Sequence, residues 1–249
     1  MQWTRRYWLR IGALLGGGIL FGCTLPNLPP PGSTNKFVKG VDTQEARGQL
    51  GVGTGWAAIG NDIGDGTMKS DFLLFPAEGT LTSWLSDRYG LSFSVGSYGT
   101  LGIEGNLQLG QRGRFRLGLV HGIAVGLMGE LGGGGVNWDG QLMMDFPIGF
   151  FFQTDWGKNR IVYGGLRYVY GFTEIFGDQN DAFRQKSSTH FLTASTGIRF
   201  PLGKLTISPE LVLVYGRWLM HSVTGGDESN KRASNCYYVF PMVFFSSGF

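Results

Sequence analysis

The sequence predicts an all-β fold: an antiparallel up-and-down transmembrane β-barrel of about ten strands, within a range of about 8–12. Three observations support this prediction. Apolar and polar residues alternate along many short segments, and tight turns alternate with longer connections between them. The chain of 249 residues has 43 glycines, 14% aromatic residues and only 16% charged residues, with a mean hydropathy close to zero. Strands with one apolar and one polar face give this composition.

The first segment, residues 1–22, is predicted to be an export leader. Its start is basic, and the apolar core that follows at 11–21 is too short to span a membrane as a helix. Residues 20–23 (Leu-Phe-Gly-Cys) resemble a lipobox. The resemblance implies that Cys23 is acylated and becomes the N-terminus, and the threonine that follows it implies delivery to the outer membrane.

Two other interpretations of this leader are open. It could be an ordinary leader that happens to be followed by Cys23. Residues 4–10 also resemble a twin-arginine signal, but that route carries folded cargo. Because a barrel stays unfolded until it reaches its membrane, we favour the lipoprotein leader.

The rest of the chain divides into a linker and a single domain. Residues 23–42 are predicted to be the lipidated cysteine and a proline-rich periplasmic linker, because the prolines keep the chain extended. Residues 43–249 are predicted to form the barrel. Its strands are expected at 47–59, 72–85, 91–95, 100–109, 115–129, 141–154, 161–173, 190–200, 205–219 and 237–249.

The connections between these strands alternate in length. Tight turns are expected at 86–88, 111–113, 157–159 and 202–204, and longer connections at 96–99, 131–140, 175–188 and 223–235. This rhythm is typical of barrels with short periplasmic turns and larger outer loops. An even number of strands places both the N- and C-termini in the periplasm.

Two segments show the strand faces clearly. Along 100–109, leucines and isoleucine alternate with glycine, glutamate, asparagine and glutamine, and 205–215 alternates in the same way. A soluble sandwich also alternates. The small, glycine-rich polar face and the turn rhythm favour the barrel.

The polar faces place charged residues in the lumen. The predicted lumen charge network consists of Arg47, Glu78, Glu104, Arg116, Asp145, Arg167, Arg199 and Glu210. Counting back from the turns pairs Arg116 with Glu104 and Arg199 with Glu210. Buried charge is tolerated when it is paired, so a salt-bridged interior is expected, with a selective pore lined by the same charges as the alternative.

Two features fit this barrel badly. Pro76, Pro147, Pro209 and Pro241 fall inside strands, where proline removes a ladder hydrogen bond, so we expect bulges at these positions. His121 falls on the outer, apolar face of its strand, and the alternation does not account for it.

The last stretch, residues 236–249 (CYYVFPMVFFSSGF), alternates apolar residues and ends on phenylalanine. It resembles the closing strand of bacterial outer-membrane β-barrels, whose apolar alternation and terminal phenylalanine are read by the barrel-assembly machinery. The resemblance implies that Phe245 and Phe249 belong to an assembly signal. It also implies location in the bacterial outer membrane, to which the lipobox resemblance adds a lipid anchor through Cys23 on the periplasmic side.

The search for chemistry is mostly negative. His121, His190 and His221 lack the spacing of zinc motifs, so no metal and no cofactor are predicted. The glycine-rich stretch at 131–139 lacks the lysine of a phosphate-binding loop. The net charge of +3 is scattered along the chain, so no nucleic-acid partner is expected.

Barrel enzymes are a further alternative. Omptin-like proteases place acidic residues and histidines at the outer rim, where His221 with Asp227, and Asp178 with Asp181, could lie. Their spacing matches no such motif, and the His-x-Ser of lipid A deacylase-like barrels is absent after the other two histidines. No enzymatic activity is therefore predicted.

We expect a non-catalytic, lipid-anchored structural or docking component of an envelope protein assembly. Its expected partners are outer-membrane lipid, the barrel-assembly machinery and other envelope proteins. A narrow channel for small solutes or ions is the alternative, and a rim-located enzyme, protease-like or lipid-hydrolase-like, is the third.

Overall fold

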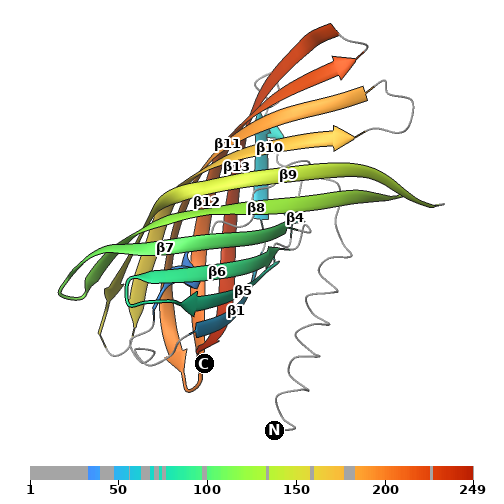
Figure 1. Ribbon diagram of the computed structural model, residues 1–249. Helices are drawn as coiled ribbons and strands as arrows, with labels where there is room; N and C mark the ends of the chain where they lie inside the picture. The colour runs from blue at the N-terminus through green and yellow to red at the C-terminus, as the bar shows by residue number, and fades with distance from the viewer. Residues whose placement is uncertain are drawn as a thin grey trace.

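One antiparallel sheet curls round and closes on itself to form the wall of the molecule (Figure 1). The computed structural model describes residues 33–39, 48–55, 57–62, 68–69, 73–74, 77–96, 100–132, 135–157, 160–176, 183–224 and 227–248. Its elements are the 3-10 helix η1 (Asn35–Phe37) and the strands β1 (Gly48–Gly55), β2 (Ala57–Asp62), β3 (Met68–Lys69), β4 (Leu73–Leu74), β5 (Ala77–Trp84), β6 (Tyr89–Gly96), β7 (Thr100–Arg112), β8 (Phe115–Gly132), β9 (Gly135–Asp155), β10 (Ile161–Phe176), β11 (Phe183–Leu202), β12 (Leu205–Thr224) and β13 (Asp227–Gly248).

The last strand closes the barrel. β13 pairs with β12 on one side and with β1 and β2 on the other, always antiparallel. Gly55 lies opposite Met242 and Ala58 opposite Val239, which is one continuous register, so β1 and β2 are two parts of one wall strand. The two-residue strands β3 and β4 pair with β2. In the described chain the wall therefore has ten strands, β1/β2 and β5 to β13, which confirms the predicted up-and-down barrel.

The hairpins at one end of the barrel are longer than predicted. The predicted loops 131–140, 175–188 and 223–235 are wrong over most of their length, because β9, β11 and β13 already begin within them. Paired backbone N–H and C=O groups satisfy one another whatever side chains they carry, so the ladders continue through polar sequence. Figure 1 shows these hairpins reaching beyond the ends of β5 and β6.

The turns at the opposite end are tight, as predicted. Gly113, Gly157 and Gly203 each adopt a positive φ, of 59°, 63° and 62°. Glycine adopts this left-handed conformation without steric cost, which lets the chain reverse within a few residues. This end of the barrel, with its short turns, is called the short-turn mouth below.

The described prolines lie in the ladders without the predicted bulges. Pro241 pairs with Leu211 of β12 in an unshifted register. The β8–β9 ladder has a gap beside Pro147, and the β11–β12 ladder has a gap beside Pro209. Each ladder resumes in the same register, because a missing N–H removes a hydrogen bond but adds no residue. Pro76 lies outside the described residues. The register shifts lie elsewhere, at Gln108/Gly110, Met128/Glu130 and Ser222/Thr224.

The two faces of the wall differ as the alternation predicts. Along β7, Leu101 and Ile103 are exposed on the outside, while Glu104 and Asn106 are buried inside. The exposed apolar side chains of the other strands continue this outer belt and include Phe93, Leu117, Ile148, Phe150, Leu166, Leu192, Leu213, Tyr237 and Val243. In the described part of the chain no helix is long and apolar enough to cross a membrane.

The inner face has two contrasting regions. The acidic arc comprises the buried inward polar side chains of β5 to β7, which are Glu78, Thr80, Thr82, Ser92, Ser94, Thr100, Glu104 and Asn106. The apolar arc comprises buried inward side chains of β12 and β13, which are Val212, Val214, Tyr238, Phe240, Met242 and Phe244. The two arcs determine what the lumen holds.

Candidate functional site

The lumen is occupied by the chain's own segment Ser33–Lys39, called the plug below. Every residue from Ser33 to Val38 is at most 2% exposed. The plug contains the single turn η1, and its partners come from strands between β5 and β12. The predicted periplasmic linker, residues 23–42, needs correction over this part, because Ser33–Lys39 lies inside the barrel.

Lys36 stands at the centre of an ionic cluster. Its Nζ lies 2.9 Å from Oε1 of Glu78 and 2.6 Å from Oε2 of Glu104. The other carboxylate oxygen of Glu104 lies 3.0 Å from Nη1 of Arg167. Burial alone lowers the pKa of Lys36, but the carboxylates of Glu104 and Glu78 raise that pKa by more. The net result is a pKa above the ordinary value, so Lys36 remains a cation inside the protein.

Glu210 receives the start of the plug. Its Oε1 accepts a hydrogen bond from the backbone N–H of Thr34 at 2.9 Å, and its Oε2 accepts one from Oγ of Ser33 at 2.7 Å. The hydroxyl of Tyr163 also donates to Oε2, at 3.3 Å. The hydroxyl of Thr34 also donates to Oε1, at 3.3 Å. Hydrogen bonds, three of them from the plug, therefore replace the water that this buried carboxyl group has lost.

Other wall side chains also bind the plug's backbone, among them Thr82, whose hydroxyl donates to the carbonyl of Lys36 at 2.9 Å. Nη1 of Arg199 donates to the carbonyl of Val38 at 2.6 Å, and Nη2 of Arg167 donates to the carbonyl of Ser33 at 3.3 Å. The amide of Gln153 accepts from the N–H of Lys39 at 3.1 Å and donates to its carbonyl at 3.0 Å. These bonds satisfy backbone groups that burial would otherwise leave unpaired.

Apolar contacts complete the fit. The ring of Phe37 lies 5.9 Å from that of Phe151, and Val38 packs in one buried cluster with Ile161 and Tyr163. Gly165 lets the plug approach the wall, because a Cβ at this position would lie 2.5 Å from Cγ2 of Thr34. The inner wall is therefore complementary to the plug in shape as well as in charge.

Both predicted ion pairs of the lumen are wrong. Glu104 pairs with Lys36 and Arg167, whereas Arg116 lies opposite Gln111 near the turn, several residues along the strand from Glu104. Counting back from the turn placed Arg116 too deep in the barrel. Arg199 binds the carbonyl of Val38 and Oγ of Ser246 at 2.9 Å, so it does not serve Glu210.

The remaining residues of the predicted set have different placements. Asp145 is buried, at 1% exposed, and its Oδ2 has no hydrogen-bond partner. Phe245 points outward from β13 between Val52 of β1 and Ile207 of β12. Three predicted residues lie outside the described residues: Cys23, Arg47 and Phe249.

The two described histidine side chains lie on the outer part of the wall. The ring of His121 stacks on that of Tyr89 with centroids 6.2 Å apart. Gly105 makes room for the stack, since a Cβ there would meet atoms of both rings. His190 forms a hydrogen bond with the hydroxyl of Tyr168. The stack on Tyr89 accounts for His121, which the alternation left unexplained.

Among the described residues, those considered for a rim enzyme do not lie together in one site. Asp178 and Asp181 lie outside the described residues. His221 of β12 lies opposite Lys231, whereas Asp227 lies opposite Thr224, at a different level of the hairpin. Among the described residues no three histidine, cysteine or acidic side chains gather as a metal site requires.

Sequence reasoning missed the plug entirely. The available signal was Lys36 and Phe37, a charged and an aromatic residue directly after the proline-rich stretch. The charges of the predicted lumen set gave no second signal, because its four acids matched its four arginines. The shortage of wall cations is visible only in the structure, where the buried acids Glu78, Glu104, Asp145 and Glu210 face the buried Arg167 and Arg199.

Comparisons with known proteins give likenesses of fold. No protein-family model and no curated protein matches the chain. Among solved structures, the outer membrane protease OmpT from Escherichia coli is similar with a TM-score of 0.46 and 9% identity, covering 81% of this chain and 96% of that chain. The outer membrane protein OprG from Pseudomonas aeruginosa is similar at 0.35 and 13%, covering 82% and 97%. Ail, the attachment invasion locus protein of Yersinia pestis, is similar at 0.33 and 10%, covering 80% and 99%.

Proposed function

We propose that this protein is a non-catalytic, lipid-anchored outer-membrane β-barrel that acts as a structural or docking component of an envelope protein assembly. The observation that carries the proposal is the plug: seven residues of the chain's own N-terminal part fill the lumen. A barrel whose lumen is filled offers its rims and its outer surface for function.

The outer surface supports placement in a membrane. Exposed leucine, isoleucine, phenylalanine and tyrosine side chains surround the barrel, while charged side chains are buried inside it. Hydrocarbon favours such an apolar band, and a closed sheet leaves no unpaired edge in it. Acylation of Cys23 would add a lipid anchor to this arrangement.

The contacts of the plug support a closed resting state. Withdrawing the plug would remove Lys36 from Glu78 and Glu104 and three donors from Glu210. Removing one partner of a buried ion pair costs about 3–5 kcal/mol. Thermal motion alone therefore opens the lumen rarely.

A narrow channel is the second candidate, and the acidic wall favours it. If the plug were withdrawn, the buried charges of the described wall would be Glu78, Glu104, Asp145 and Glu210 against Arg167 and Arg199. An excess of carboxylates lining a pore attracts cations. The channel candidate therefore predicts cation selectivity.

Conductance in planar lipid bilayers separates the two candidates. The docking function predicts no steady current from the purified full-length protein. Lys36→Glu should expel the plug by repulsion from Glu78 and Glu104 and produce a cation-selective current. Lys204→Glu makes the same charge change on an exposed turn and should stay silent. A steady current from the unmodified protein would overturn the closed-barrel proposal.

Docking itself is tested by crosslinking in intact cells. A photoreactive residue in place of Arg114, on an exposed short turn, should give a discrete crosslinked protein band. The same residue in place of Leu213, on the outer apolar belt, should react with lipid and serves as the control. Only diffuse or no crosslinks from several short-turn positions would contradict a docking function.

A further inference from the structure

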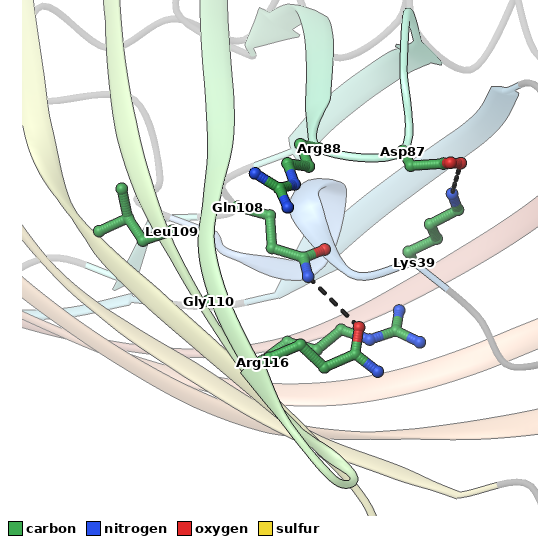
Figure 2. A pocket seen from close by; sticks show the side chains of 8 residues that line it. Lys39, Asp87, Arg88, Gln108, Leu109, Gly110 and Arg116 are labelled. Carbon is green, nitrogen blue, oxygen red and sulfur yellow. Dashed lines mark hydrogen bonds and ion pairs between the residues drawn. The ribbon is translucent and has the colours of Figure 1, made fainter.

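A pocket of about 510 Å³ opens at the short-turn mouth, beside the end of the plug (Figure 2). Lys39, the last described residue of the plug, lines one part of it, the turn between β5 and β6 contributes Asp87 and Arg88, and β8 contributes Arg116. Two amide side chains of β7, Gln108 and Gln111, complete its polar lining.

The charges of this pocket are unbalanced. Three cations, Lys39, Arg88 and Arg116, face a single acid, Asp87. Asp87 lies 3.8 Å from Lys39 and is fully exposed, so this ion pair is weak. Arg116 is half-buried, and within the described ranges neither Arg116 nor Arg88 forms an ion pair. A half-buried guanidinium without a counter-ion favours an anion at this place.

The positions of these cations are fixed by the local fold. Oγ of Ser86 accepts hydrogen bonds from the N–H groups of Arg88 at 3.3 Å and Tyr89 at 3.0 Å, which holds the turn. The carbonyl of Arg88 accepts from the N–H of Gln108 at 2.7 Å, which ties the turn to β7. At this point the register of β7 shifts between Gln108 and Gly110, and such bulges redirect side chains.

Lys39 is held just as firmly. The amide of Gln153 binds both the N–H and the carbonyl of Lys39, and the Lys39 ammonium lies 5.6 Å from the ring centre of Trp84. Seating the plug therefore delivers one of the three cations to the pocket. The pocket is complete only when the lumen is closed.

We propose that this mouth pocket binds an acidic segment of a partner protein. The three cations come from the plug, a turn and β8, and Figure 2 shows their side chains lying apart around the pocket. A single phosphate is held by groups that converge on one point, whereas spaced carboxylates on an extended chain match separate guanidinium groups. This assignment of a partner rests on the docking function proposed above.

The position of the pocket favours a soluble acidic chain over a lipid headgroup as its ligand. Arg116 lies on the same face of β8 as the buried residues Gly118 and Val120, which is the inner face of the wall. Lys39 belongs to the plug within the lumen. Headgroups of the surrounding membrane lie outside the wall, so a water-soluble acidic chain reaches this site more directly.

Fluorescence anisotropy with the purified full-length protein in detergent tests the proposal. The probe is a labelled peptide with several glutamates, and its glutamine counterpart is the negative control. We expect the glutamate peptide alone to bind, with an affinity that falls as salt rises. The double variant Arg88→Gln/Arg116→Gln should weaken binding about tenfold or more, because it removes two charge-assisted contacts.

A matched variant and a competitor decide the outcome. Arg160→Gln/Lys204→Gln removes the same charge from exposed positions outside the pocket and should leave binding unchanged. Equal weakening by both double variants would mean diffuse surface attraction and overturn the site. Competition by inorganic phosphate, beyond that of chloride at equal ionic strength, would assign the pocket to small oxyanions instead. Unboiled gel mobility verifies that each variant is folded.

This test is independent of the conductance test. Among the described residues, neither Arg88 nor Arg116 forms an ion pair with the plug's ionic cluster, so their variants should remain electrically silent. A silent barrel that fails to bind the glutamate peptide would overturn the pocket assignment and leave the closed-barrel function standing. A barrel that conducts yet binds the peptide would overturn the closed-barrel function, and the pocket would then consist of Arg88 and Arg116 without Lys39.

Discussion

The acidic arc and the apolar arc fill the same lumen by different means. In the apolar arc, the wall packs against itself: the ring of Phe244 lies over Gly53, where a Cβ would come within 2.1 Å of it. In the acidic arc, Glu78 and Glu104 depend on Lys36, which no wall strand supplies. In the apolar arc the wall strands therefore satisfy their own inward side chains. In the acidic arc the inward carboxylates have a full set of partners only when the plug is in place.

The two arcs should therefore respond differently to substitution. Loss of an apolar side chain leaves a cavity, whose cost is independent of salt and does not involve the plug. Loss of the plug's cation leaves carboxylates buried without a partner. The following predictions test this contrast, from the largest expected effect to the smallest.

Lys36→Met should lower the free energy of unfolding by about 3–5 kcal/mol, because Glu78 and Glu104 lose their shared cation. The unfolding midpoint in urea, followed by unboiled gel mobility, measures this loss. Adding Glu78→Gln should recover much of the loss, since Arg167 still serves Glu104. Lys204→Met, on an exposed turn, should have little effect. Equal stability of Lys36→Met and the unmodified protein would contradict the ionic cluster.

Phe244→Ala should lower the free energy of unfolding by about 3 kcal/mol through the cavity that it leaves. The plug should stay seated, so trypsin should cleave after Lys36 no faster than in the unmodified protein under folded conditions. Rapid cleavage in this variant would mean that the two arcs are coupled, and the contrast between them would fail.

Gly165→Leu should displace the plug without changing any charge. The added side chain would occupy the space of Thr34, and overpacking of this kind costs about 1–3 kcal/mol. Trypsin should then cleave after Lys36 in the folded barrel, and a current should appear in planar bilayers. Gly110→Leu adds the same side chain at an open position and is the control. A Gly165→Leu variant that resists trypsin would contradict the tight approach of plug and wall.

Asp145→Asn should have the smallest effect, between no change and about 1 kcal/mol of added stability. The Asp145 carboxyl group is buried and its Oδ2 has no hydrogen-bond partner, so removing its charge removes a desolvation cost. Glu104→Gln makes a matched change in the acidic arc and should destabilise the barrel. A clear loss of stability in Asp145→Asn would indicate a bound cation at this carboxyl group.

Much of the wall could be predicted from the sequence, because strand alternation is a local property. Each strand turns one face to the lumen, so the parity of Leu101 and Glu104 already gives their directions. The tight turns could also be predicted from the sequence, since Gly113 and Gly203 occupy positions that need a left-handed backbone. The ends of the strands in the long hairpins could not be predicted, because a polar strand and a polar loop have the same composition.

The contents of the lumen could not be predicted in the same way. Glu104 of β7 and Arg167 of β10 meet across the interior, whereas sequence patterns relate only neighbouring strands. The pairing of Arg116 with Glu104 relied on such a neighbour relation and was wrong. A segment as short as Ser33–Lys39 has no periodicity to detect.

The plug also affects how the chain reaches its final state. Lys36 binds Glu78, which is 42 residues away, while Thr34 binds Glu210, which is 176 residues away. Contacts of such long range form late, because the intervening chain must first be ordered. The contacts of β13 with β1 join the two ends of the barrel in the same way. Seating of the plug and joining of the barrel's ends are therefore expected as one concerted late event in folding, with the first described residues of the chain among the last to find their place.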